Sequence, residues 1–106
     1  MYDFKNVSKM KKLEVHAPKA MQAFMAFDKA ALAEGAVPKK YKELIALGVA
    51  FTTQCPYCIE IHANNARQAG ASASEIAESV LVAATLRAGG AIAHLACHEG
   101  NMKGAL

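Results

Sequence analysis

The sequence has no tryptophan, only three prolines, and an aromatic content of 7% over 106 residues. Runs of β-branched residues are short, and the 54% of hydrophobic residues come mainly from Ala, Leu, Val, Ile and Met. Small side chains let helices approach closely, and this composition disfavours a β-sandwich. We therefore expect an all-α fold, a bundle of about five to six helices, with residues 1–106 forming a single domain.

A strong excess of one charge is also missing. Twelve basic and nine acidic residues give a net charge of +3. The lysines gather between Lys5 and Lys19 and again from Lys39 to Lys42, and Tyr41 is the one aromatic residue among them. This pattern is typical of solvated helix faces, so we expect no nucleic-acid partner. A chain this short buries little surface alone, which makes association with further copies a natural way to enlarge its core.

No apolar run follows the first residues, so the sequence predicts no signal peptide. The longest uncharged segment, residues 44–59, is too short and too polar to span a bilayer, and we expect no membrane partner. These features predict a cytoplasmic protein. In that reducing compartment the three cysteines are not expected to form a disulfide framework, and a Cys-x-x-Cys pair is more often catalytic or metal-binding.

Apolar spacing, together with proline and glycine punctuation, predicts a series of helices. The Leu44–Phe51 run is apolar on every side, which indicates a buried helix, and Gly48 within it predicts close approach of a neighbouring helix. Gly89-Gly90 predicts a kink or break. The expected helices cover residues 4–14, Pro18 to a C-cap at Gly35, Lys39–Thr53, about Pro56–Ala69, a segment starting at the Ser72-x-x-Glu75 capping box, and Ala91 to about Glu99.

The chemistry-bearing stretch is Cys55-Pro56-Tyr57-Cys58-Ile59-Glu60-Ile61-His62. Pro56 suits the first position of a helix, which would make Cys55 the N-cap and put Cys58 in the first turn. His62 follows one turn later. Because these positions share one helix face, both sulfurs and the imidazole should point the same way. The pattern suits cysteine redox chemistry and could also suit metal binding.

A helix N-terminus lowers the pKa of a thiol, and the thiolate is the reactive form. His62 is placed to take the proton of Cys58 or to pair with its thiolate. A thiolate can attack a peroxide and become a sulfenic acid, which a second thiol converts to a disulfide. The helix terminus alone favours Cys55 as the nucleophile, whereas His62 favours Cys58, with Cys55 supplying the second thiol.

Glu43 is the only acidic residue of the predicted buried helix. A carboxylate that enters a core needs a partner, and His62 is the candidate because a proton-shuttling histidine works best when another group orients it. Glu43 could equally lie exposed in the first turn of its helix, where acidic residues are favoured.

The combination Glu43-x11-Cys55-x2-Cys58-x3-His62 resembles the core motif of the AhpD-like alkylhydroperoxidase and carboxymuconolactone decarboxylase superfamily. The resemblance extends from about Ala30 to His94. It implies an all-α fold that assembles as a homo-trimer or homo-hexamer. In the peroxidase branch, Cys58 would be the peroxidatic cysteine, Cys55 the resolving one, and His62 with Glu43 a proton relay.

The resemblance further implies a thiol-dependent peroxidase or disulfide oxidoreductase that acts on hydroperoxides. A dithiol reductant protein, lipoyl-bearing or thioredoxin-like, would regenerate it, and neither a dissociable cofactor nor a metal is implied. The decarboxylase branch lacks the cysteine pair, so the pair points away from lactone decarboxylation. The chain departs from the best-known peroxidase members at Tyr57, where they carry a histidine.

The sequence leaves two alternatives to a thiol-dependent enzyme open. Cys55, Cys58 and His62 could bind zinc, with Glu43 or a residue of the last helix as the fourth ligand. The last helix offers a second group on one face: His94, Cys97 and His98. The other alternative is a small helical oligomer whose thiols sense redox state without peroxidase turnover.

Overall fold

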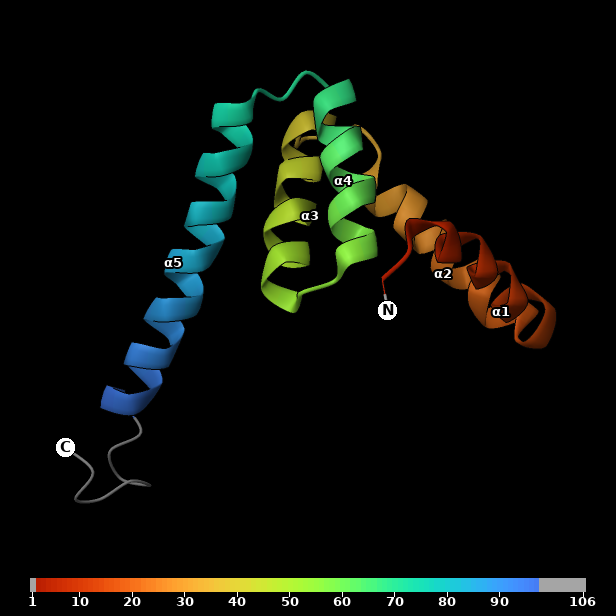
Figure 1. Cartoon of the computed structure of the whole chain (residues 1–106), viewed down its shortest axis with the longest axis horizontal. Coiled ribbons are helices and arrows are strands. Elements are labelled where there is room, and N and C mark those ends of the chain that lie inside the picture. Colours follow the sequence, from red (N-terminus) through yellow and green to blue (C-terminus); the bar gives the residue numbers. More distant parts are fainter. Residues whose placement is uncertain (1, 98–106) are drawn as a thin grey trace.

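The computed structural model describes residues 2–97. Over that range the chain forms helices and no strand, which confirms the predicted all-α fold. In Figure 1, α1 and α2 lie at the right, α3 and α4 at the centre and α5 at the left. The elements are a 3-10 helix η1 (Phe4–Met10), α1 (Lys11–His16), α2 (Pro18–Leu32), α3 (Lys39–Thr53), α4 (Pro56–Gln68) and α5 (Ala73–Cys97).

Helices α3 and α4 form an antiparallel hairpin at the centre of the molecule (Figure 1). The predicted helix Lys39–Thr53 is confirmed residue for residue. Its buried side packs against α4, with Leu47 and Ala66 both at 0% exposure. The expectation that this helix is buried on every side is wrong for the single chain, since Ile45 is 61% and Val49 57% exposed. Helix α3 therefore has one core face and one open apolar face.

The predicted helix starts are confirmed where proline or a capping box marks them. Proline occupies the first turn of α2 and of α4. The Ser72–Glu75 box is reciprocal: the Glu75 N–H donates to Ser72 Oγ at 3.1 Å, and the Ser72 N–H donates to Glu75 Oε1 at 2.9 Å. Gly70, with φ +94°, ends the turn after α4 in the left-handed conformation that glycine tolerates best.

Three glycine-based or spacing-based predictions differ from the structure. Helix α2 ends at Leu32, and Gly35 is not a left-handed cap, because Gly70 is the one glycine between residues 2 and 97 with positive φ. Helix α5 continues through Gly89-Gly90 without a break, and the predicted end at Glu99 lies outside the described residues. The first predicted helix divides into η1 and α1.

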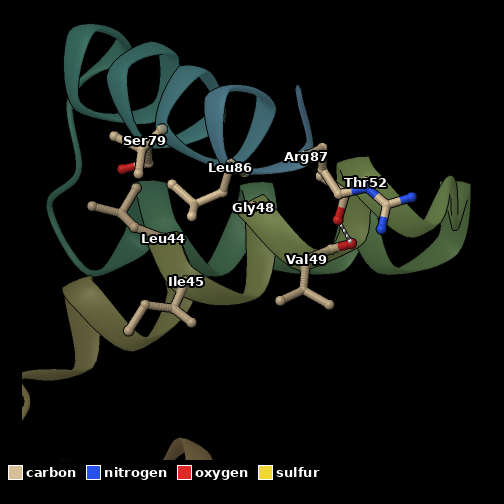
Figure 2. A pocket seen from close by; sticks show the side chains of 10 residues that line it. Leu44, Ile45, Gly48, Val49, Thr52, Ser79, Leu86 and Arg87 are labelled. Atoms are coloured by element: carbon tan, nitrogen blue, oxygen red, sulfur yellow. Dashed lines mark hydrogen bonds between the residues drawn. The ribbon is translucent and has the colours of Figure 1, made fainter. Parts of the chain in front are cut away.

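Helix α5 packs along α3 through small side chains. A Cβ added at Gly48 would lie 3.3 Å from the Ala83 Cβ, which confirms the predicted close approach of a neighbouring helix. Beside this contact the two helices enclose a shallow pocket of about 400 Å³. Figure 2 shows Leu44 and Gly48 of α3 facing Ser79 and Leu86 of α5 across it.

None of the 25 residues of α5 is buried. Leu86 is 66% and Ile92 70% exposed. Helix α5 is long and apolar enough to cross a membrane, by length and composition only. Core helices of soluble proteins meet the same two criteria. The single chain thus leaves a long apolar helix uncovered.

Candidate active site

The cysteine pair lies at the turn from α3 into α4. Gln54 takes the left-handed conformation (φ 58°), which reverses the chain and delivers Cys55 to the N-cap of α4, as predicted. The Cys58 N–H donates to Cys55 Sγ at 3.3 Å, and the two sulfurs lie 2.7 Å apart. Both are free thiols. The local fold therefore brings two reduced sulfurs into direct contact at a helix N-terminus.

The two thiols have opposite acidities. The pKa of Cys55 is lowered because the Cys58 side chain hydrogen-bonds to it and the N–H groups of Cys58 and Tyr57 also favour its thiolate. The pKa of Cys58 is raised to about 11 by the same hydrogen bond to Cys55 and by burial. Of the two thiols Cys55 therefore loses its proton more readily, and its thiolate is stabilised by a hydrogen bond from the Cys58 thiol.

Glu43 and His62 meet between α3 and α4. Glu43 has 0% exposure, and its Oε2 lies 2.6 Å from His62 Nδ1. The partner expected from the sequence is therefore in contact, and the alternative of an exposed Glu43 is wrong. The other oxygen, Oε1, accepts a hydrogen bond from Lys39 Nζ at 3.0 Å. Both carboxylate oxygens thus have a donor, so the buried charge is compensated.

Burial raises the pKa of Glu43, but the hydrogen bonds and positive charges of His62 and Lys39 lower it by more. The net result is a pKa below the ordinary value of glutamic acid, and Glu43 is a carboxylate at neutral pH. A carboxylate at Nδ1 fixes the ring of His62 and leaves its Nε2 as the nitrogen available for proton transfer.

An apolar pocket of about 630 Å³ adjoins this group. Cys58 and His62 both line it, whereas Cys55 does not. The wall consists mostly of apolar residues of α2 and α3, and Asp28 is its acidic member. The remaining wall residues are Phe24, Phe27, Ala31, Leu32, Ala46, Val49, Ala50 and Thr53. A small apolar molecule in this pocket would meet Cys58 and His62.

Tyr57, the residue between the cysteines, packs against the N-terminal segment. Its ring and that of Tyr2 meet edge to face, with centroids 4.9 Å apart. The Tyr2 hydroxyl donates to the Glu60 carboxylate, which raises the pKa of Tyr2 to about 12. Tyr57 therefore links the thiol turn to the start of the chain.

The zinc alternative finds no support in the part of the chain that the structure describes. Across residues 2–97, no group of three or more His, Cys, Asp or Glu side chains is arranged to hold a metal ion. Of the four candidate ligands, His62 and Glu43 are bonded to each other, and the two sulfurs contact each other. Cys97 lies on α5, and His98 is outside the described residues.

Lys39 is the site residue that sequence reasoning missed. It was assigned to a solvated lysine group, yet its ammonium contacts the buried Glu43. The available signal was its spacing: Lys39 precedes Glu43 by four residues, and such pairs face each other on a helix. The spacing predicts a contact of this kind more strongly when the carboxylate is buried, because a buried carboxylate needs a partner.

The carboxymuconolactone decarboxylase family model matches residues 18–96. A crystal structure of apo-lpg0406, a carboxymuconolactone decarboxylase family protein from Legionella pneumophila, is similar with a TM-score of 0.69 and 32% identity. That alignment covers 76% of this chain and 71% of the Legionella chain. The match includes α2 to α5 almost entirely, and hence the whole candidate site.

Two curated relatives carry no assigned activity. "Uncharacterized protein 4 in cox locus" of Paracoccus denitrificans is 51% identical over 72 residues, which is 68% of this chain and 65% of the relative. An uncharacterized protein of Haemophilus influenzae is 47% identical over 49 residues, 46% of this chain and 43% of the relative. The matched segment thus spans less than two thirds of each relative's length.

Proposed function

The chain belongs to the carboxymuconolactone decarboxylase family, and we propose that it is a thiol-dependent peroxidase or disulfide oxidoreductase of the alkylhydroperoxidase type. One observation carries the proposal. Two reduced sulfurs lie 2.7 Å apart, and Cys58 shares an apolar pocket with His62, whose ring is held by a buried carboxylate.

In the first step His62 takes the proton of the Cys58 thiol, and Glu43 stabilises the imidazolium that forms. The Cys58 thiolate then attacks the terminal oxygen of a hydroperoxide ROOH, and the O–O bond breaks. Cys58 becomes a sulfenic acid, and the alkoxide takes the proton from His62 and leaves as ROH. The raised pKa of Cys58 makes this base necessary at neutral pH.

In the second step the Cys55 thiolate attacks Cys58 Sγ and forms the disulfide. The sulfenic hydroxyl leaves and, with a proton from solvent, becomes water. The lowered pKa of Cys55 supports this role, since it favours the thiolate, the reactive form of the resolving sulfur. A dithiol protein, lipoyl-bearing or thioredoxin-like, then reduces the disulfide and is itself oxidised, which closes the cycle.

The test is a thiol count combined with sulfenic-acid trapping. One equivalent of hydroperoxide should remove two thiols per chain, reversibly with a dithiol. After peroxide, a dimedone-type probe should label Cys55→Ser, which cannot resolve, and leave Cys58→Ser unlabelled. The reverse labelling would exchange the two roles, and loss of no thiols would refute peroxidase chemistry at this pair.

Turnover separates this enzyme from a redox sensor of the same fold. With a dithiol reductant, hydroperoxide consumption should exceed that of an equal concentration of free thiol and should stop in Cys58→Ser. Consumption no faster than free thiol would leave the sensor as the better description. One tightly bound zinc per chain in untagged protein would contradict both.

We also propose that the protein acts in the cytoplasm as a homo-trimer or homo-hexamer, in which further copies cover α5. The free thiols at residues 55, 58 and 97 suit a reducing compartment. The exposed side chains of Leu86 and Ile92 suit contacts between copies. Light scattering should give three or six chains per particle, and Leu86→Glu should give smaller particles. A wild-type monomer, or one that sediments with lipid vesicles, would contradict this assembly.

A further inference from the structure

We propose that Lys39 is a positioning residue of the site, which holds the buried Glu43 as a carboxylate and aims its second oxygen at His62. This inference rests on the proposed function, because it concerns the relay that would deprotonate Cys58. Lys39 bonds Oε1 of Glu43, whereas His62 bonds Oε2. The hydrogen bonds of the Lys39 ammonium go to Glu43 and to the Leu32 carbonyl, and not to either thiol.

The geometry divides the carboxylate between two donors. Lys39 Nζ lies 3.0 Å from Oε1 of Glu43, and His62 Nδ1 lies 2.6 Å from Oε2. With Oε1 occupied by the ammonium, the carboxylate plane is fixed and Oε2 is presented to the ring. An imidazolium and an ammonium on separate oxygens both favour the charged form of Glu43 over the neutral acid.

Lys39 is itself held in place by the end of α2. Its Nζ also donates to the Leu32 carbonyl at 3.1 Å, and its backbone N–H donates to the Glu34 carboxylate at 2.6 Å. Cations are favoured where the last carbonyls of a helix are unpaired. One ammonium therefore joins the C-terminus of α2 to the buried acid. The same α2 supplies Phe27 and Asp28 to the wall of the pocket at Cys58.

The charge balance shows why the site needs this cation. Glu43 has 0% exposure, whereas 44% of the Lys39 side chain is exposed. The ammonium thus keeps part of its hydration while it compensates a carboxylate that has lost all of its own. Without Lys39, the contact with His62 alone would oppose the effect of burial, and the pKa of Glu43 would rise.

Lys42 provides a matched control. Its Nζ donates to the carbonyls of Ala31 and Ala33 at 2.8 and 2.6 Å, so it caps the same end of α2 with the same chemistry. Its ammonium contacts these carbonyls and not Glu43. A change that appears in both the Lys39 and the Lys42 variants results from the altered end of α2. A change that appears only in the Lys39 variants results from the lost contact with the Glu43 carboxylate.

The experiment compares Lys39→Met, Lys39→Gln, Lys39→Arg and Lys42→Met in the full chain. Carboxyl ¹³C NMR of Glu-labelled protein, with Glu43→Gln to assign the signal, follows the ionisation of Glu43. Lys39→Met and Lys39→Gln should move its titration midpoint to higher pH. Lys39→Arg and Lys42→Met should leave the midpoint unchanged. The acid limb of the peroxidase pH profile should move in parallel, with a loss of about tenfold in turnover near pH 6, where relays of this kind contribute 10²-fold or more.

An unchanged midpoint in both neutral variants, or an equal shift in Lys42→Met, would overturn the proposal. If one neutral variant fails to fold, as its circular dichroism would show, the other decides. Absent turnover in the wild type would refute the proposed function, yet the NMR titration would still decide whether Lys39 keeps Glu43 ionised.

Discussion

The α3–α4 hairpin and helix α5 differ in almost every property that a folded chain can show. The hairpin contains the buried leucines, the buried carboxylate and the cysteine turn. Helix α5 is the longest element and is rich in apolar residues, yet none of its residues is buried in the single chain. Sequence hydrophobicity alone therefore does not predict whether a helix is buried within one chain, since α3 and α5 are both rich in apolar residues.

The comparison also separates chemistry from assembly. Every polar contact of the site comes from α3, from α4 or from the chain end of α2 that Lys39 joins to them. The α5 residues beside α3 include the small Ser79 and Ala83, and the ion pair between the two helices, Lys40–Glu75, lies outside the site. We infer that changes in the hairpin should act on the reaction, and that changes in α5 should act on the association of chains.

The largest expected effect is on the reaction. Glu43→Gln keeps the size of the side chain but removes the charge that stabilises the His62 imidazolium, so peroxide turnover should fall by about 10²- to 10⁴-fold. The control is Glu60→Gln, which removes a carboxylate of α4 that is bonded to Tyr2 and not to His62. Steady-state kinetics should show less than threefold loss for the control, within about 0.7 kcal/mol. Equal losses would mean that general charge, and not the relay, matters.

The next effect is on stability. Leu47→Ala removes a side chain with 0% exposure and should cost about 2–5 kcal/mol of unfolding free energy at any protein concentration. Leu81→Ala, at a position 66% exposed on α5, should cost less, and its loss should depend on protein concentration if further copies cover it. Denaturant titrations at two protein concentrations test both. A concentration-independent loss at Leu81 as large as that at Leu47 would erase the distinction between the two regions.

Acid should weaken the hairpin through Glu43. Because its pKa is lower in the folded than in the unfolded chain, its contribution is fully present above the unfolded pKa and is lost as the pH falls through the folded pKa. The wild type should therefore lose stability below about pH 4.5, the ordinary value for this group, and Glu43→Gln should lose less over the same range. Thermal unfolding between pH 3 and pH 7 measures this. A steeper acid loss in the variant would contradict the sign.

The smallest effects come from two glycines. Gly48→Ala brings a Cβ to 3.3 Å from that of Ala83, so it should lower stability by about 1 kcal/mol. Gly89→Ala meets nothing within 4 Å in the single chain and should raise stability by up to about 1 kcal/mol through helix propensity. Melting temperatures compare the two. Destabilisation by Gly89→Ala would locate a neighbouring copy against that face of α5.

Local rules predicted the parts of the fold that local interactions determine. Proline at the first turn and the Ser72–Glu75 box each fixed a helix start correctly, since the groups involved lie within one turn. Gly89-Gly90 misled the prediction, because two glycines cost a helix only about 2 kcal/mol and the rest of α5 outweighs that cost. Gly35 did not act as a cap for a different reason: α2 ends before it, at Leu32.

The candidate site was predicted in part. The partnership of Glu43 with His62 followed from the rule that a buried carboxylate needs a donor. The catalytic roles of Cys55, Cys58, His62 and Glu43 stay a prediction. Lys39 was not singled out, because its spacing to Glu43 indicates a contact at the site only once Glu43 is known to be buried, and its contact with the end of α2 depends on the tertiary fold.

The short connection between α4 and α5, which contains Gly70 and Ser72 and is here called the joint, sets the direction in which α5 leaves the hairpin. Helix α5, with 25 residues, is about 37 Å long, and Figure 1 shows it running past the end of α3. It is anchored near its first turn, where Lys40 Nζ lies 2.9 Å from Glu75 Oε2. A rotation of about 10° at this joint would sweep the far end through about 6 Å. In the proposed assembly, a sequence change at this joint would alter how copies packed on α5 are spaced and would leave the residues of the thiol turn unchanged.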